Sequence, residues 1–177
     1  MAWSVRFFVI FAIVLSPILA SCSREKTPGP GPKDETDKLI AEYTEAIWLE
    51  PKDANGYYKR GVRYEELGES DKAIADFTEA IELKEQRAYV NRAASYKKKK
   101  DYDKAIADYT MTIAFYDKHG SDLSDALLRA GASAGAYFDR GICYEEKGDA
   151  EKAQADFKKA VELHAPFKEK VKNRTKK

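Results

Sequence analysis

The sequence has few of the residues from which catalytic and metal-binding sites are usually built. Its 177 residues include two histidines and two cysteines. His119 and His164 have no second ligand at a metal-binding spacing, and two cysteines are too few for a disulfide framework. We find no Gly-rich phosphate loop, no nucleophile elbow and no zinc-binding His-Glu helix motif. The sequence therefore does not indicate an enzyme, and we expect neither a cofactor nor a metal.

The chain also lacks a charge of one sign. Its 31 Lys and Arg residues nearly balance 30 Asp and Glu residues, and the formal net charge is +1. Proteins that bind duplex nucleic acid usually carry a basic excess, so we do not expect a nucleic acid partner. Charged residues nevertheless make up 34% of the chain, and prolines are few outside one tract. This composition is typical of exposed helices.

Residues 1–21 have the features of a secretory signal peptide. Arg6 is their only charged residue, and a continuous apolar run covers residues 7–15. The run ends near Pro17 and is shorter than the roughly 20 apolar residues of a membrane-spanning helix. We therefore predict a signal peptide over residues 1–21.

The segment Leu19-Ala20-Ser21-Cys22 resembles the lipobox of bacterial lipoproteins. In that family the cysteine thiol is diacylated, the signal is cut just before it, and the new amino group is usually acylated. Two or three acyl chains hold a protein firmly at a membrane, whereas one alone binds weakly. The resemblance implies that Cys22 is lipidated and anchors the chain. The alternative is an ordinary secretory signal followed by an incidental cysteine.

Residues 22–35 continue from this cysteine as a tract of alternating proline and glycine, which we interpret as a tether without helix. Fully extended, it would reach about 40 Å. In the lipoprotein family, Ser23 resembles the residue that directs sorting to the outer membrane. The resemblance therefore implies a place in the cell envelope, on the outer membrane facing the periplasm if the host is Gram-negative.

A pattern of small and large residues repeats through residues 36–165. Four similar segments place Leu39, Ala73, Ala105 and Ala153 at equivalent positions, at spacings of 34, 32 and 48. Similar segments that begin with an aromatic residue precede the last three. The first copy of the full pattern comprises Tyr57, Gly61, Tyr64, Ala73, Phe77 and Ala80. The second comprises Tyr89, Ala93, Tyr96, Ala105, Tyr109 and Thr112, and the third Tyr137, Gly141, Tyr144, Ala153, Phe157 and Ala160.

This pattern resembles the tetratricopeptide repeat, an antiparallel pair of helices of 34 residues. Thr112 departs from the small apolar residue that the family prefers, and only Pro51 matches its loop proline. The resemblance implies an all-α solenoid of antiparallel helix pairs, with about three full repeats after an N-terminal second helix that lacks its first. We expect this half-repeat at residues 36–50, repeats at about 54–85, 86–117 and 134–165, an insertion at about 118–133, and a basic C-terminal tail at 166–177.

The irregular parts of the repeat array lead to further expectations. The half-repeat has no partner helix for an outward face that includes Tyr43 or Trp48, which makes it a candidate self-association surface. The favoured alternative is that Trp48 and Leu49 fold back onto the first full repeat. We expect the insertion to lengthen the first helix of the third repeat, loosened at Gly131 and Gly135. It forms either a lip over the binding groove or an elongated hairpin. In the tail, Phe167 and Val171 are spaced to cover the last repeat as a short cap. Its basic residues are expected in a frayed end rather than in contact with anionic lipid or an acidic partner.

Charged residues recur within the repeats. Arginines at equivalent positions of the predicted first helices are Arg60, Arg92 and Arg140. Acids at equivalent positions of the second helices are Asp76, Asp108 and Asp156, with Glu42 in the half-repeat. We hypothesise ion pairs across the helix packing, in which each arginine meets an acid of its own repeat, of the preceding repeat, or of both.

In this family the first helices line a concave face that binds peptides. The resemblance places the groove at Tyr58, Val62, Val90, Asn91, Ala94, Phe138 and Ile142. Members that grip a C-terminal carboxylate use two lysines, two asparagines and an arginine, and only Asn91 matches that set. We therefore expect an extended or helical segment with apolar side chains rather than an acidic C-terminus. The alternative is that neighbouring helices fill part of this surface.

The sequence thus predicts a membrane-anchored, non-enzymatic scaffold of the bacterial cell envelope that binds another protein in the groove. One alternative is a structural lipoprotein that self-associates through its open N-terminal repeat end. A third hypothesis is an accessory subunit of an envelope enzyme complex. Cys143 is interpreted as a small buried thiol rather than a reactive one.

Overall fold

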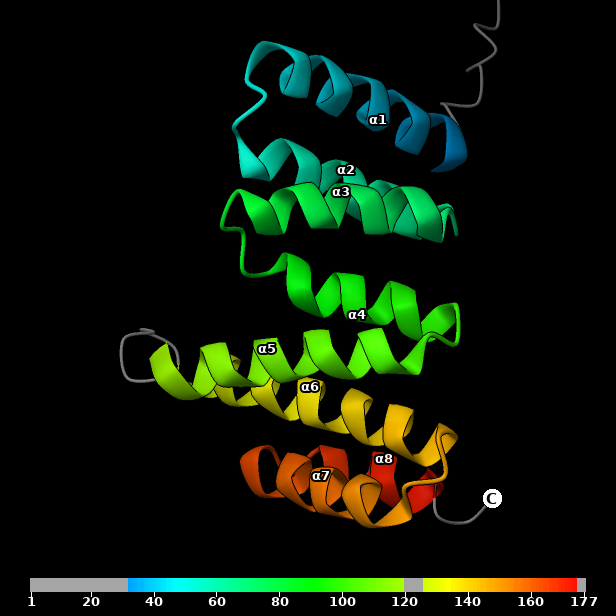
Figure 1. The fold of residues 1–177 in the computed structure, drawn as a ribbon, viewed down its shortest axis with the longest axis vertical. Coiled ribbons are helices and arrows are strands. Elements are labelled where there is room, and N and C mark those ends of the chain that lie inside the picture. Colours follow the sequence, from blue (N-terminus) through cyan, green and yellow to red (C-terminus); the bar gives the residue numbers. More distant parts are fainter. Residues whose placement is uncertain (1–31, 120–125, 175–177) are drawn as a thin grey trace, which may run out of the picture.

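The computed structural model describes residues 32–119 and 126–174. Within these ranges the chain forms α-helices and no strand. The helices are α1 (Pro32–Leu49), α2 (Ala54–Glu66), α3 (Ser70–Glu82), α4 (Ala88–Lys98), α5 (Tyr102–His119), α6 (Ala126–Glu146), α7 (Ala150–Leu163) and α8 (Phe167–Arg174). They stack along one long axis, with α1 at one end and α7 and α8 at the other (Figure 1). The predicted all-α solenoid of helix pairs is confirmed.

The same turn joins the first and second helix of each full repeat. The backbone of Gly68, Lys100 and Gly148 has φ values of 76°, 61° and 84°. The next residue's N–H then donates to a carbonyl five residues earlier, as from Glu69 to Tyr64 at 2.9 Å. This is the pattern of a helix end closed by a left-handed residue, for which glycine is the least strained choice.

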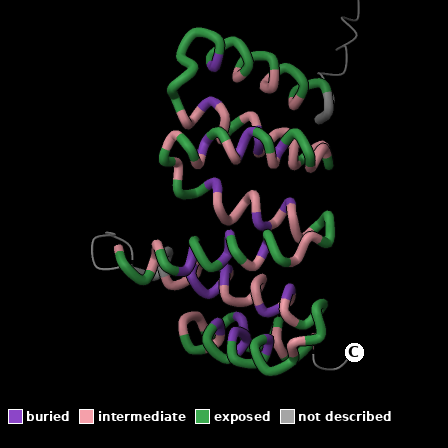
Figure 2. Tube along the Cα trace, viewed as in Figure 1, coloured by how far each residue is buried: buried purple, intermediate pink, exposed green. Residues whose placement is uncertain are grey.

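The small and large residues of the repeat fit together at the crossing of paired helices. Ala73, Phe77 and Ala80 of α3 are fully buried, and the burial is concentrated between neighbouring helices (Figure 2). A Cβ atom added at Gly61 would lie 2.8 Å from the Phe77 ring. At Gly141 it would lie 2.7 Å from the Phe157 ring and 3.2 Å from the Ala153 carbonyl oxygen. The glycines therefore let the two backbones approach while an aromatic ring fills the remaining space.

The hypothesised ion pairs are present in all three full repeats. The Arg92 guanidinium donates two hydrogen bonds of 2.8 Å to the Asp108 carboxylate. Arg60 binds Asp76 in the same way at 2.8 and 2.7 Å, and Arg140 binds Asp156 at 2.8 and 2.8 Å. Each arginine meets the acid of its own repeat. These side chains are mostly buried, with exposures of 16% for Arg92 and 6% for Asp108.

A threonine of the preceding second helix is the further partner of each arginine. Nη1 of Arg92 donates to the Thr78 hydroxyl at 3.0 Å, and the equivalent bonds reach Thr44 at 3.1 Å and Thr110 at 2.9 Å. Each hydroxyl donates in turn to the carbonyl four residues earlier, at 2.7 Å. We call this arrangement of three Arg-Asp-Thr sets the arginine ladder. It links every full repeat to the helix before it.

The N-terminal end differs from two expectations. Helix α1 begins at Pro32 rather than near residue 36, because the first turn of a helix tolerates proline, whose missing N–H has no intrahelical partner there. Trp48 and Leu49 do not fold back onto the first full repeat: they are 79% and 64% exposed. Helix α1 instead contacts α2 through Ile47, which lies against Gly56, and its opposite side is left open.

The insertion forms an elongated helical hairpin. Helix α5 continues to His119, and α6 runs without a break from Ala126 to Glu146, through both Gly131 and Gly135. The expected loosening at these glycines is therefore absent. The hairpin reaches beyond α4 on one side of the stack (Figure 1). Residues 120–125 of the predicted insertion lie outside the described residues.

The C-terminal tail forms a helix instead of fraying over residues 167–174. Phe167 is 8% exposed and packs with Ala134 and Ala160. Arg174 forms ion pairs with Glu145 and, at 3.2 Å, with Glu146. Apolar contact and these pairs together hold α8 against the last repeat.

We predict opposite effects of alanine at two glycines of α6. Gly141→Ala should lower the free energy of unfolding by about 1–3 kcal/mol, because the new methyl group overlaps the Phe157 ring and a backbone oxygen. Gly131 has nothing within 4 Å of its added Cβ, so Gly131→Ala should raise that energy by up to about 1 kcal/mol through helix propensity. Urea unfolding followed by circular dichroism measures both. Equal stability of the two variants would contradict the packing argument.

Candidate protein-binding surface

The seven residues predicted for the groove lie in one row on three stacked first helices. Helix α2 carries Tyr58 and Val62, and α4 carries Val90, Asn91 and Ala94, while α6 carries Phe138 and Ile142. Residues four apart share one face of a helix, so the pairs 58/62, 90/94 and 138/142 repeat the same placement. All seven are half-buried. We call this set the first-helix row.

Part of the row is filled by the chain itself. Phe138 lies between two other rings, with centroids 5.5 Å from Phe157 and 5.3 Å from Phe167. Helix α8 supplies Phe167, which sequence reasoning placed only on the end of the last repeat. Val62 and Val90 also pack partly against the buried clusters of their repeats. Helix α8 therefore covers the row at Phe138.

Asn91, the one residue that matches a carboxylate-gripping set, is already hydrogen-bonded within the row. Its Nδ2 atom donates to the Tyr58 hydroxyl at 3.1 Å. The Arg87 guanidinium lies over the Tyr58 ring, 4.7 Å from the ring centre, and binds Glu85 at 2.7 Å. These contacts fix Tyr58 in place and leave the amide less available to a peptide backbone.

Two residues beside Tyr58, Arg87 and Tyr116, were not predicted from the sequence. Arg87 could have been found, because it stands four residues before Asn91, at the N-cap of α4. Tyr116 belongs to the lengthened end of α5, and only the structure places it near this surface. Burial raises the pKa of the Tyr116 phenol, and the nearby Tyr58 phenol adds to the rise. The α5 extension thus adds an aromatic residue beside the row.

A strip of ion pairs joins the first helices near their C-terminal ends. Lys98 of α4 binds Glu65 of α2 at 2.8 Å, and Lys97 of α4 binds Asp139 of α6 at 2.5 Å. Lys99 reaches Asp71 of α3. Three consecutive lysines at the end of α4 are therefore paired with acids of other helices. Because these charges largely neutralise one another, the row lies beside a strip with little net charge.

Two titratable side chains belong to the buried cluster between α4, α5 and α6. Tyr109 is fully buried and replaces the phenylalanines of the other two repeats, and its hydroxyl has no hydrogen-bond partner in the described part of the chain. Burial raises the pKa of Tyr109. Cys143 is also fully buried, and burial raises the pKa of its thiol to about 11. It stays protonated near neutral pH, as expected for an unreactive thiol.

The described helices carry neither a metal cluster nor a membrane span. Over residues 32–119 and 126–174, no three His, Cys, Asp or Glu side chains are grouped so that they would hold a metal ion. None of the helices in these ranges combines the length and the apolar character needed to cross a bilayer.

Two family models, each described as a tetratricopeptide repeat, match the chain. One matches residues 54–87 and 134–165, and the other matches residues 86–110. Together they cover just over half of the sequence. The matched segments correspond to the helix pairs α2–α3, α4–α5 and α6–α7. A comparison with curated protein sequences gives no match.

Solved structures with the same fold include proteins titled MamA. One is 26% identical with a TM-score of 0.62, covering 73% of this chain and 64% of that chain. MamA from Desulfovibrio magneticus is 22% identical with a TM-score of 0.63, covering 73% and 67%. The chain thus spans about two thirds of the length of these proteins. The Arabidopsis OM64 tetratricopeptide domain is 24% identical with a TM-score of 0.54, covering 68% of this chain and 92% of that one.

Proposed function

Since the chain belongs to the tetratricopeptide-repeat family, we propose that it is a protein-interaction scaffold that holds a partner on the first-helix row. The observation that carries this proposal is the row itself. Half-buried, mostly apolar side chains recur at one position on three stacked helices. Proteins of this family typically act by binding other proteins, and we assign no catalytic residue to this chain.

The chemistry of the row favours an apolar partner segment. The neighbouring charges are already paired between helices, and Asn91 already donates to Tyr58. An acidic C-terminus would therefore find Lys97, Lys98 and the Asn91 amide already engaged. An amphipathic helix that lays its apolar face along Val62, Ala94 and Ile142 would instead remove apolar surface from water, which is the main favourable term in such binding.

The covered end of the row limits where the partner lies. Phe138 is held between Phe157 and Phe167, so the partner contacts the side of the row that α8 leaves uncovered, which includes Val62, Ala94 and Ile142. Tyr58 and Tyr116 border that side, and aromatic residues of this kind often dominate binding energy. The lengthened α5 thus adds to the binding surface at the end where α8 does not cover it.

We predict that a charge placed in the middle of the row weakens binding. The probes are synthetic amphipathic helical peptides labelled with a fluorophore, and the measurement is fluorescence anisotropy. Ala94→Glu should weaken the peptide dissociation constant by at least about tenfold, because a carboxylate would be buried against apolar side chains. Ala107→Glu is the matched control, since Ala107 is exposed on the second helix α5. It should leave binding and the melting temperature unchanged.

If the Ala94 and Ala107 variants bind the best peptide equally well, the first-helix row is not the binding site. If none of the peptides binds the unmodified chain, an amphipathic helix is not its ligand. Melting curves of both variants show whether a loss of binding reflects a loss of fold.

We further propose that the scaffold is held at a membrane of the bacterial cell envelope through acyl chains on Cys22. The support is the apolar run at residues 7–15 and the segment Leu19-Ala20-Ser21-Cys22, which lie outside the described residues. Only nine residues separate Cys22 from the start of α1 at Pro32. The ten Cα-to-Cα steps from Cys22 to Pro32 set an upper limit of about 36 Å on the distance between them, shorter than the roughly 40 Å expected from the sequence. The host and its membrane decide whether this is an outer membrane.

Replacing the cysteine should abolish lipid attachment. In a bacterial host fed an alkyne-labelled fatty acid, the unmodified chain should carry the label and fractionate with membranes. Cys22→Ser should carry no label, because only the thiol forms the thioether. Cys143→Ser is the control and should keep the label. Persistent labelling of the Cys22 variant would contradict the anchor while leaving the first-helix row as the binding site.

A further inference from the structure

The two ends of the helix stack differ in shape and in charge. At the N-terminal end, the outer side of α1 is open, with Trp48 79% and Leu49 64% exposed. Trp48 and Leu49 are two of the three most exposed large hydrophobic residues of the described chain, the third being Met111. Helix α1 also carries five acidic and two basic residues. Its open face is therefore acidic, with an apolar edge at its C-terminal end.

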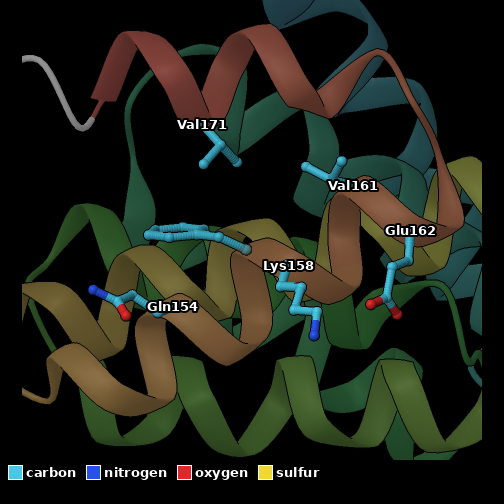
Figure 3. A pocket seen from close by; sticks show the side chains of 6 residues that line it. Gln154, Lys158, Val161, Glu162 and Val171 are labelled. Carbon is cyan, nitrogen blue, oxygen red and sulfur yellow. The ribbon is translucent and has the colours of Figure 1, made fainter.

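At the C-terminal end, a hollow of about 400 Å³ lies between α7 and α8. Phe157, Val161 and Val171 supply its apolar wall, and Gln154, Lys158 and Glu162 surround it. Figure 3 shows Val171 of α8 and Val161 of α7 on opposite sides of the opening. This volume is near the lower end of pockets that hold small molecules. It is of a size to receive one large side chain.

The sequence of α7 explains why the hollow is there. In α3 and α5, the positions equivalent to Gln154 and Lys158 are isoleucine and threonine. The threonine hydroxyls accept a hydrogen bond from the arginine of the next first helix. In α7, Lys158 stands in place of this acceptor threonine, and Val171 of α8 lines the same hollow. The arginine ladder therefore ends at α7, and α8 covers its face only partly.

Helix α8 has the opposite charge to α1. Its eight residues include four basic side chains and one acidic side chain, whereas α1 has an excess of three acids. Opposite potentials steer two surfaces together and disfavour the pairing of like surfaces. A contact between two α1 helices would place acid against acid. A contact between α1 and the α7–α8 end would place acid against base.

We propose that the protein associates with itself head to tail, with the outer face of α1 docked on the α7–α8 end of a second copy. Trp48 enters the hollow between α7 and α8 with Leu49 at its edge, and the acids of α1 face the lysines of α8. The stack begins with a second helix, α1, and α8 follows α7 in the place of a first helix. Docking α1 of one copy on α8 of another therefore continues the alternation of first and second helices. Because the two surfaces differ, each copy keeps one free end, and the association propagates or closes into a ring.

This association is independent of the first-helix row, which lies along the side of the stack. It leaves Ala94 and its neighbours free, so a bound partner and a second copy do not compete. Because charge contributes to the contact, added salt should weaken the association over the range in which it screens exposed charges.

The test is sedimentation equilibrium of the full chain over a wide concentration range, with a mild detergent in every sample to keep the apolar run at residues 7–15 dispersed. The mass of the unmodified chain should rise with concentration. Trp48→Glu should weaken the dissociation constant at least tenfold without changing the melting curve, because Trp48 is exposed. Val171→Glu and Lys158→Glu should do the same from the other end. Met111→Glu, at an exposed apolar residue of α5, is the control and should have no effect.

Mixing the variants separates this proposal from its rivals. A Trp48→Glu copy keeps its C-terminal end, and a Val171→Glu copy keeps its α1 face, so an equimolar mixture should form pairs that grow no further. If the Val171 and Lys158 variants associate as tightly as the unmodified chain, copies meet through α1 alone and the proposal fails. Equal weakening by Met111→Glu would indicate non-specific apolar contact and would also overturn it. A chain that stays monomeric at every concentration would do the same.

Discussion

An arginine that binds an aspartate of its own repeat and a threonine of the preceding helix recurs three times along this chain. The aspartate accepts two hydrogen bonds from one guanidinium, and the third donor nitrogen reaches the threonine hydroxyl. Both charges are largely buried, and a buried ion pair is tolerated only where its hydrogen bonds are well satisfied. The ladder therefore fixes both the register within a repeat and the register between repeats. Small residues such as Gly61 and Gly141 allow the close approach that these bonds need.

This constraint explains where the protein is free to bind others. The ladder and the aromatic core occupy the contact between first and second helices, so the outer positions of the first helices remain as a continuous row. Where the ladder stops, the stack is left incomplete. Before α2 there is only α1, whose Glu42 pairs locally with Lys38 at 3.8 Å. After α7 there is only α8, and a lysine stands where the threonine would be. The row along the side and the two unlike ends are thus consequences of one repeated bond pattern.

The repeats and the ion pairs could be predicted from the sequence because residues of equal chemistry recur at the same spacing within each repeat. This recurrence predicts an acid partner for Arg92, and the structure selects Asp108 of the same repeat. The role of Thr78 was missed, although threonine recurs at positions 44, 78 and 110. Other features depend on contacts that periodicity does not encode. Trp48 looks like a core residue, but its exposure follows from a missing neighbouring helix. The covering of Phe138 depends on how α8 turns back, and the placement of Tyr116 depends on the length of α5. The sequence therefore predicts the row as one position on three helices, whereas the covering of part of it by the chain itself required the structure.

A double-mutant cycle on Arg92 and Asp108 tests the ladder most directly. Arg92→Leu leaves a buried carboxylate without its partner, so it should lower the free energy of unfolding by about 3–5 kcal/mol. Asp108→Leu leaves the buried guanidinium without its partner and should lower that energy by a similar amount. The double variant should lose clearly less than the sum of the two, which identifies a coupled pair. If Arg92→Leu instead unfolds at the same urea concentration and temperature as the unmodified chain, the ladder does not hold the repeats together, and apolar packing alone sets their register.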